Sequence, residues 1–210
     1  MVTLEHLKLG YAMGKKFVSM HDFKGKRALD VGCGHCAHTL AYAEKFDNVD
    51  AIDIENGVDR KLLSAISPAE KKIDFMQEDF LVYYFHKDFY DLVFTLSALE
   101  HISKWKEALG KMYHILKPGG LLQVVISPLY YSPLGHHLDP EIGEWSHILV
   151  PEVKLKKFFF DQGGQQWEWD LYKQLNKITA ADFLALVEPN FIEEFLTISI
   201  TTIHYVGRKP

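Results

Sequence analysis

Short apolar runs alternate along most of the chain with segments that have helical periodicity. Strands are predicted at residues 27–31, 49–54, 73–77, 91–96 and 121–126. Helices are predicted at residues 39–46, 59–65 and 104–116, the last ended by a Pro-Gly-Gly turn. Each predicted strand is apolar on both faces, as buried parallel strands are. Strands that alternate with helices indicate a parallel sheet covered by helices on both faces.

The two ends of the chain extend this pattern. Residues 4–20 have apolar side chains at nearly helical spacing, which predicts one or two leader helices. Thr179 starts a predicted helix as its N-cap, with Asp182 in the capping-box position. Residues 195–206 alternate like a terminal antiparallel strand or hairpin. We therefore expect an α/β fold with a doubly wound, mostly parallel sheet of seven strands.

The alternation stops after the fifth predicted strand. Residues 128–170 are rich in proline, glycine, tyrosine and histidine, and a loop of this length in a compact domain is usually functional. A chain of 210 residues suits one domain better than two. We expect a single domain over 1–210, with 1–24 as an N-terminal lid helix and 128–170 as a long insertion on the substrate side.

Charge and composition exclude several partners. The net charge is -5 and the basic residues are scattered, which disfavours nucleic acid as a partner. No stretch approaches the roughly 20 apolar residues that cross a bilayer, so no membrane partner is expected. Two cysteines are too few for a disulfide framework and indicate a reducing compartment. We expect a cytoplasmic monomer or homodimer.

The strongest candidate chemistry follows the first predicted strand, in Asp30-Val-Gly-Cys-Gly-His-Cys-Ala37. Gly32 and Gly34 would let a ligand approach the backbone closely, beside the free N–H groups of the next helix. Alone, this pattern matches a nicotinamide dinucleotide fingerprint equally well. Asp53, at the end of the second strand, can accept hydrogen bonds from both hydroxyls of a ribose.

Two further acidic positions favour a different nucleoside cofactor. Asp79 follows the third strand and supplies an acceptor for an adenine amine, with Phe80 as an apolar neighbour for the ring. Asp30 lies two residues before the first glycine, where dinucleotide folds usually have an apolar residue. The three carboxylates are expected to converge around one nucleoside at the carboxyl ends of adjacent strands.

At this point the chain resembles the class I S-adenosylmethionine-dependent methyltransferases, particularly the branch of ubiquinone and menaquinone biosynthesis. The matching segments are LDVGCGHCAHT, AIDIENG, FMQEDF, YDLVFTLSALEHI and LKPGGLLQVV. The resemblance implies S-adenosylmethionine as the cofactor. It also implies these cofactor-binding residues: Asp30, Gly32 and Gly34 for the methionine part, Asp53 with its neighbour Ile54 for the ribose, Asp79 and Phe80 for the adenine, and Thr95 or Leu96 for the inner side.

One departure from the family stands in the glycine turn. Cys36 occupies the position where the family usually has a third glycine. A side chain at this crowded turn would weaken cofactor binding or move the loop slightly.

Methyl transfer needs little more than alignment, because the sulfonium methyl is already activated. A nucleophile held about 3 Å away attacks in line, and proximity supplies most of the rate. A hydroxyl acceptor would also need a general base. The candidates are His101, after the fourth strand, and His136, His137 and His147 in the insertion.

Two other readings of these residues are less favoured. Cys33 and Cys36 have the spacing of a redox motif but lack its proline and tryptophan context. The histidines of the insertion and Asp139 could bind a metal, but adjacent histidines rarely both coordinate one ion, so no metal is predicted.

The predicted function is the transfer of a methyl group from S-adenosylmethionine to an unidentified small-molecule acceptor. Two alternatives remain. Cys36 keeps open a non-catalytic interaction module of the same fold. The bare glycine pattern keeps open an NAD-dependent oxidoreductase.

Overall fold

The computed structural model describes residues 2–138 and 142–210. Its strands form one seven-stranded sheet in the order β3-β2-β1-β4-β5-β7-β6. The strands are β1 (Arg27–Val31), β2 (Asn48–Asp53), β3 (Ile73–Gln77), β4 (Tyr90–Leu96), β5 (Leu116–Ile126), β6 (Ile192–Ile198) and β7 (Ile203–Arg208). Strands β1 to β5 pair in parallel, and β7 is antiparallel to both of its neighbours. The predicted doubly wound, mostly parallel fold is confirmed.

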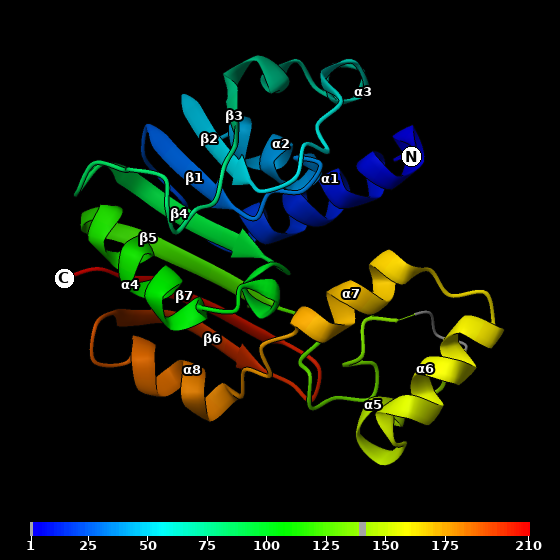
Figure 1. Cartoon of the computed structure of the whole chain (residues 1–210). Helices are drawn as coiled ribbons and strands as arrows, with labels where there is room; N and C mark the ends of the chain where they lie inside the picture. The colour runs from blue at the N-terminus through cyan, green and yellow to red at the C-terminus, as the bar shows by residue number, and fades with distance from the viewer. Residues whose placement is uncertain (1, 139–141) are drawn as a thin grey trace.

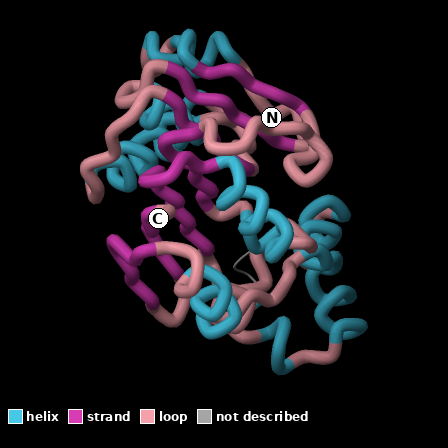
Figure 2. Tube along the Cα trace, turned by 90° about the vertical axis from the view of Figure 1, so that its left-hand side faces the viewer, coloured by secondary structure: helices cyan, strands magenta, loops and turns pink. Residues whose placement is uncertain are grey.

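Helices cover both faces of the sheet (Figures 1 and 2). The α-helices are α1 (Leu4–Ser19), α2 (Ala37–Ala43), α3 (Arg60–Ser64), α4 (Trp105–Ile115), α5 (Ser146–Leu149), α6 (Glu152–Asp161), α7 (Gln166–Gln174) and α8 (Ala180–Val187). Two 3₁₀ helices are η1 (Pro68–Lys72) and η2 (Leu99–His101). No helix within the described ranges has both the length and the hydrophobicity to cross a membrane.

The two cores of the domain follow from the alternation of side chains along buried strands. In β1, Leu29 and Val31 belong to one core, whereas Ala28 belongs to the other. Met112 of α4 packs into the first core, and Leu40 of α2 packs into the second. Burial on both faces explains why these strands read as continuous apolar runs in the sequence.

The sheet order changes direction between β1 and β4. From β1 the chain adds β2 and then β3 on one side, whereas β4 and β5 are added on the other side. The loops that leave β1 and β4 therefore run to opposite faces, and a crevice opens between them at the carboxyl ends of the strands. This crevice is where the sequence predicts the cofactor.

The predicted Pro-Gly-Gly turn does not separate α4 from the next strand. Strand β5 begins at Leu116, which pairs with Tyr90, and the regular register resumes with Leu92 opposite Leu121. Residues 117–120 therefore bulge out within the strand. The prediction that this strand starts at residue 121 was therefore wrong by five residues. Proline and glycine favour a bulge as well as a turn, so the sequence did not distinguish the two.

The leader forms one helix, α1, which packs along α2. A Cβ atom on Gly10 would lie 2.7 Å from the Cβ of Ala37, so the glycine permits the close approach of the two helices. Thr3 caps the start of α1 through its side chain, which accepts from the backbone N–H of His6. The role of this helix as a lid stays a prediction.

From Ser146 onward the segment after β5 is helical rather than the loop that the sequence predicted. Helices α5, α6 and α7 lie beyond the arrowheads of β4 and β5 (Figure 1). They enclose a small core of their own, formed by Leu138, Ile142, Leu155, Phe159, Trp169, Tyr172 and Leu175. These helices are too short to show clear periodicity among so many prolines and glycines. Asp139 lies outside the described residues. We call residues 142–175 the cap.

Candidate active site

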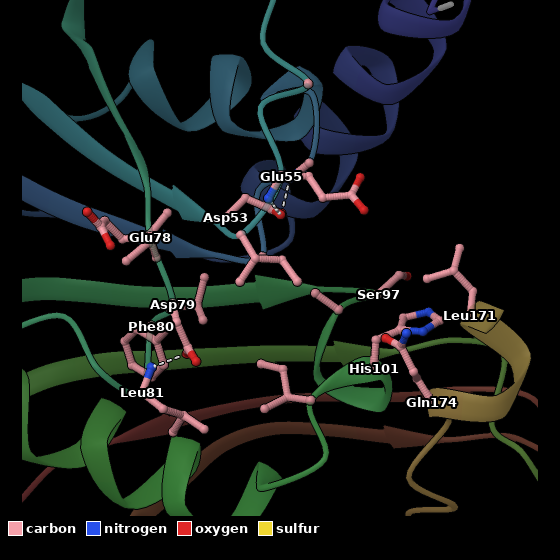
Figure 3. A pocket seen from close by; sticks show the side chains of 18 of the residues that line it. Asp53, Glu55, Glu78, Asp79, Phe80, Leu81, Ser97, His101, Leu171 and Gln174 are labelled. Atoms are coloured by element: carbon pink, nitrogen blue, oxygen red, sulfur yellow. Dashed lines mark hydrogen bonds between the residues drawn. The ribbon is translucent and has the colours of Figure 1, made fainter. Parts of the chain in front are cut away.

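A cavity of about 650 Å³ lies at the carboxyl ends of β1, β2 and β4 (Figure 3). Its lining comes from the loop after β1, the ends of β2 and β3, the segment after β4, and one face of α7 in the cap. The predicted cofactor-binding residues that line it are Gly32, Gly34, Asp53, Ile54, Asp79 and Phe80. The topology thus brings residues separated by up to about fifty positions to one surface.

The glycine turn holds Gly32, Gly34 and Cys36 in left-handed backbone conformations, and at Gly32 it has no room for a side chain. Gly32 has a φ of 75°, and a Cβ atom there would lie 2.4 Å from the Cβ of Ala98. Gly34 has a φ of 51° and open space around it, so its backbone faces the cavity. Cys36 also adopts a left-handed φ of 59°, a conformation that glycine adopts more readily than any residue with a side chain.

Asp53 joins the glycine turn to the end of β2. Its Oδ2 accepts a hydrogen bond of 2.8 Å from the N–H of Gly34, and its Oδ1 accepts one of 2.9 Å from Glu55 (Figure 3). An ionised carboxylate offers about four lone-pair sites. Two sites are used by the backbone, and the remaining ones are available to hydroxyl groups in the cavity.

Asp79 and Phe80 form a separate wall of the same cavity. Asp79 Oδ1 accepts from the N–H of Leu81 at 2.8 Å, which fixes the turn after β3 (Figure 3). Lys111 donates to the carbonyl of Phe80, and its ammonium lies 5.1 Å from the ring centroid. The ring of Phe80 is thereby held as an apolar surface next to an acidic acceptor.

Asp30 does not converge with the other two carboxylates as expected. Its side chain is buried behind the glycine turn, is not part of the cavity lining, and accepts a hydrogen bond of 2.6 Å from the hydroxyl of Thr39. Burial raises the pKa of Asp30 to about 7, partly offset by that hydrogen bond. Its side chain thus joins β1 to α2 instead of lining the cavity.

The predicted contact at the end of β4 is displaced by two residues. Thr95 and Leu96 are buried in the sheet and do not line the cavity, whereas Ser97 and Ala98 do. Ser97 has a φ of 53°, which turns the chain over the cavity directly after the strand. The sequence shows where the strand ends but not where the chain turns toward the ligand.

His101 is the one predicted base that lines the cavity. It ends η2, and Asn176 fixes that turn through hydrogen bonds from its side chain to the carbonyls of Leu99 and Ile102. Burial lowers the pKa of His101 to about 4, with a further contribution from His137. The imidazole is therefore neutral near pH 7 and can accept a hydrogen bond.

His137 lies behind His101, and their ring centroids are 5.1 Å apart. Its Nε2 donates to the carbonyl of Pro128 at 2.8 Å. One ligand atom each of Glu100, His101 and His137 lies within 4.8 Å of the others, a spacing that could hold a metal ion. His137 does not itself line the cavity. The predicted absence of a metal stays a prediction.

The structure does not bring His136 or His147 to the cavity. Both are buried beside the cap core, with ring centroids 5.5 Å apart. His136 Nδ1 accepts from the N–H of Leu138, and His147 Nε2 donates to the carbonyl of Tyr130. The prediction of His136 as a catalytic base is thereby corrected, because its side chain is buried and does not reach the cavity.

Sequence reasoning missed the face that α7 presents to the cavity. Trp167, Asp170, Leu171 and Gln174 all line it. Their spacing of three, four and seven residues places them on one side of a helix, opposite Trp169 and Tyr172 in the cap core. Helical spacing of these four residues could have revealed the face had the segment been read as a helix.

Comparisons with known proteins agree with this geometry. Residues 29–124 match the family model described as a methyltransferase domain. Phosphoethanolamine N-methyltransferase 2 of Caenorhabditis elegans is 28% identical over 134 residues, which are 62% of this chain and 30% of that protein. Sterol 24-C-methyltransferase erg6 of Schizosaccharomyces pombe is 29% identical over 62% of this chain and 34% of its own length. The chain thus spans about a third of the length of these relatives.

Solved structures show the same fold along nearly the whole chain. A Listeria monocytogenes structure described as a putative S-adenosylmethionine dependent methyltransferase has a TM-score of 0.62 at 16% identity, covering 96% of this chain and 99% of its own. Haemonchus contortus phosphoethanolamine N-methyltransferase 2 with S-adenosyl-L-methionine has a TM-score of 0.63 at 13% identity, covering 99% of this chain and 57% of its own.

Residues 29–124 thus resemble a methyltransferase domain, and nearly the whole chain has the fold of solved methyltransferase structures. S-adenosylmethionine is the cofactor that the predicted motifs favour for this cavity. The narrower resemblance to the ubiquinone and menaquinone branch stays a prediction.

Proposed function

We propose that this chain transfers the methyl group of S-adenosylmethionine to a small-molecule acceptor. One observation carries the proposal: Asp53 and Asp79, from the ends of different strands, line one cavity with the glycine turn. In this arrangement Asp53 binds the ribose, while Asp79 and Phe80 bind the adenine. Gly32 and Gly34 leave room for the methionine part.

The residues at the other end of the cavity would hold the acceptor. Ser97, Ala98 and His101 lie there with the exposed face of α7. The bound cofactor supplies an activated methyl group, so these residues need only position the acceptor atom and exclude water. Neutral His101 can accept a hydrogen bond from the acceptor, which orients its lone pair.

Size and relatives favour a small acceptor. A cavity of about 650 Å³ falls in the range of small-molecule sites, roughly 300–1,000 Å³. The relatives are named for phosphoethanolamine and for sterols, which are small molecules. The chain's scattered basic residues and net charge of -5 argue against nucleic acid. We propose a cytoplasmic monomer or homodimer.

Cys36 does not favour a non-catalytic module. Its side chain is fully buried in the core beside α2 and does not line the cavity. The cavity therefore stays open to a cofactor despite the missing glycine.

Replacing Asp53 tests the cofactor site. Asp53→Ala removes the acceptor for the ribose hydroxyls and the anchor of Gly34, and unpaired groups of this kind cost about 1–3 kcal/mol. We expect the affinity for S-adenosylhomocysteine to fall by roughly 10- to 100-fold in calorimetric titrations. Asp47→Ala, in an exposed turn outside the cavity, is the control. Equal affinities of the Asp53 variant and the unmodified protein would overturn the proposed site.

A further inference from the structure

We propose that the acceptor is a small amine that carries no phosphate or carboxylate group. The inference rests on the methyl-transfer function proposed above and names the substrate class of the same cavity. It comes from the charge of the cavity wall, from the chemistry of methyl transfer next to that wall, and from the face of α7 at the acceptor end.

The wall of the cavity is acidic. Its carboxylates are Asp53, Glu55, Glu78, Asp79 and Asp170. None of the described residues that line the cavity is lysine or arginine. Two lysines in and just after α7 are engaged elsewhere: Lys173 pairs with Glu152 at 2.7 Å, and Lys177 lies over the ring of Tyr130. At the acceptor end the carboxylate is that of Asp170, so a phosphate or carboxylate on the acceptor would meet like charge there with no lysine or arginine among the described lining residues.

This wall suits an amine better than an oxygen, sulfur or carbon nucleophile. An amine attacks as a neutral group: its lone pair forms the N–C bond while the C–S bond breaks and sulfur keeps the electron pair. The positive charge passes from the sulfonium to the new ammonium, which then releases a proton to water. An alkoxide, thiolate or enolate would place a negative charge near Asp170, and the described lining residues include no lysine or arginine to stabilise it.

The acceptor end supplies groups that recognise an amine. The indole of Trp167 is 62% exposed, and Asp170 lies one helical turn away on the same face of α7. A carboxylate and an aromatic face together bind an organic cation through charge attraction and cation–π contact. His101 lines the cavity as a neutral imidazole, and it can accept an N–H hydrogen bond from the amine after the bound ammonium has released a proton to water.

Three matched probes test the inference on the full chain saturated with S-adenosylhomocysteine. The probes are 2-phenylethylamine, 2-phenylethanol and 3-phenylpropionate, which differ in the charge at the end of one scaffold. We expect ligand-observed NMR titrations to show the amine binding at least tenfold more tightly than the other two. Equal or tighter binding of the alcohol or the carboxylate overturns the inference, and so does failure of all three probes to bind. Failure of S-adenosylhomocysteine itself to bind overturns the proposed function instead.

A pair of carboxylate variants locates the effect. Asp170→Asn should lower the affinity for 2-phenylethylamine by three- to tenfold and leave the affinity for S-adenosylhomocysteine within twofold. Asp161→Asn, an exposed carboxylate of α6 that pairs with Lys157 outside the cavity, should change neither. An unchanged amine affinity in the Asp170 variant contradicts the assigned recognition group.

Discussion

Gly32→Ala should destabilise the protein by roughly 3 kcal/mol or more. The left-handed backbone at Gly32 costs an alanine about 1–2 kcal/mol. The new Cβ would also lie 2.4 Å from the Cβ of Ala98, and relief of such a clash costs about 1–3 kcal/mol more. Urea denaturation at constant m-value measures the loss.

Two other glycines separate the causes. Gly34 has the same left-handed backbone as Gly32 but open space around it. We therefore expect Gly34→Ala to lower the free energy of unfolding by about 1 kcal/mol. Gly110 lies within α4 and has no close neighbour. Gly110→Ala should raise the free energy of unfolding by about 0.5–1 kcal/mol, because alanine favours helices. Stability of the Gly32 variant within 0.5 kcal/mol of the unmodified protein would show that the turn is free to rearrange.

The sheet was predictable from sequence because its strands are buried on both faces. Strand β3 was predicted at the observed residues, and the other parallel strands except β5 were placed to within one residue. Thr179 caps α8 as predicted, since its hydroxyl accepts from the N–H of Asp182. The pattern of apolar residues predicts a strand or helix well when the environment of its side chains is the same along its whole length.

The candidate site was predictable only in part. Glycines and acidic residues that directly follow a strand had to meet at one edge of a parallel sheet, and Asp53 and Asp79 do. Whether each of the other residues lines the cavity depends on the direction of its side chain, which the sequence does not show. Asp30 is buried, whereas Ser97 faces the cavity. The acceptor side was missed because its surface depends on how the cap folds back over the sheet.

Contacts of the cap explain why sequence alone could not place that surface. After α7, the N–H of Asn176 donates to the carbonyl of Glu100 at 2.9 Å, and its side chain bonds to the carbonyls on either side of His101. One asparagine thus fixes α7 over the turn that carries the candidate base. The side-chain hydrogen bonds of this joint link residues 77 and 74 positions apart, so the periodicity within either segment could not predict it.

Glu100→Gln should stabilise the protein at pH 8.5 and have little effect at pH 5. The side chain of Glu100 is 3% exposed, and its Oε2 has no hydrogen-bond partner among the described residues. Burial raises its pKa to about 8, although the N–H of Ser127 donates to Oε1 and opposes the shift. The folded protein therefore holds a neutral carboxyl group near pH 7, where the unfolded chain ionises.

The sign of the pH dependence follows from this difference. Below about pH 4.5 both states bind the proton, and Glu100 adds no pH-dependent cost. As the pH rises toward 8, the unfolded chain releases the proton while the folded chain retains it, so the free energy of unfolding falls. A glutamine stays neutral in both states, and the variant should gain on the order of 2–4 kcal/mol relative to the unmodified protein between pH 5 and pH 8.5.

Urea denaturation of both proteins at pH 5, 6.5 and 8.5 measures this gain. Other buried groups, such as His101, titrate in both proteins, and their contribution largely cancels in the difference. Glu107→Gln, on the exposed side of α4, is the matched control and should show a difference independent of pH. If the Glu100 difference is also independent of pH, the carboxyl group is ionised in the folded protein, and a cation must then lie beside it, near His101 and His137.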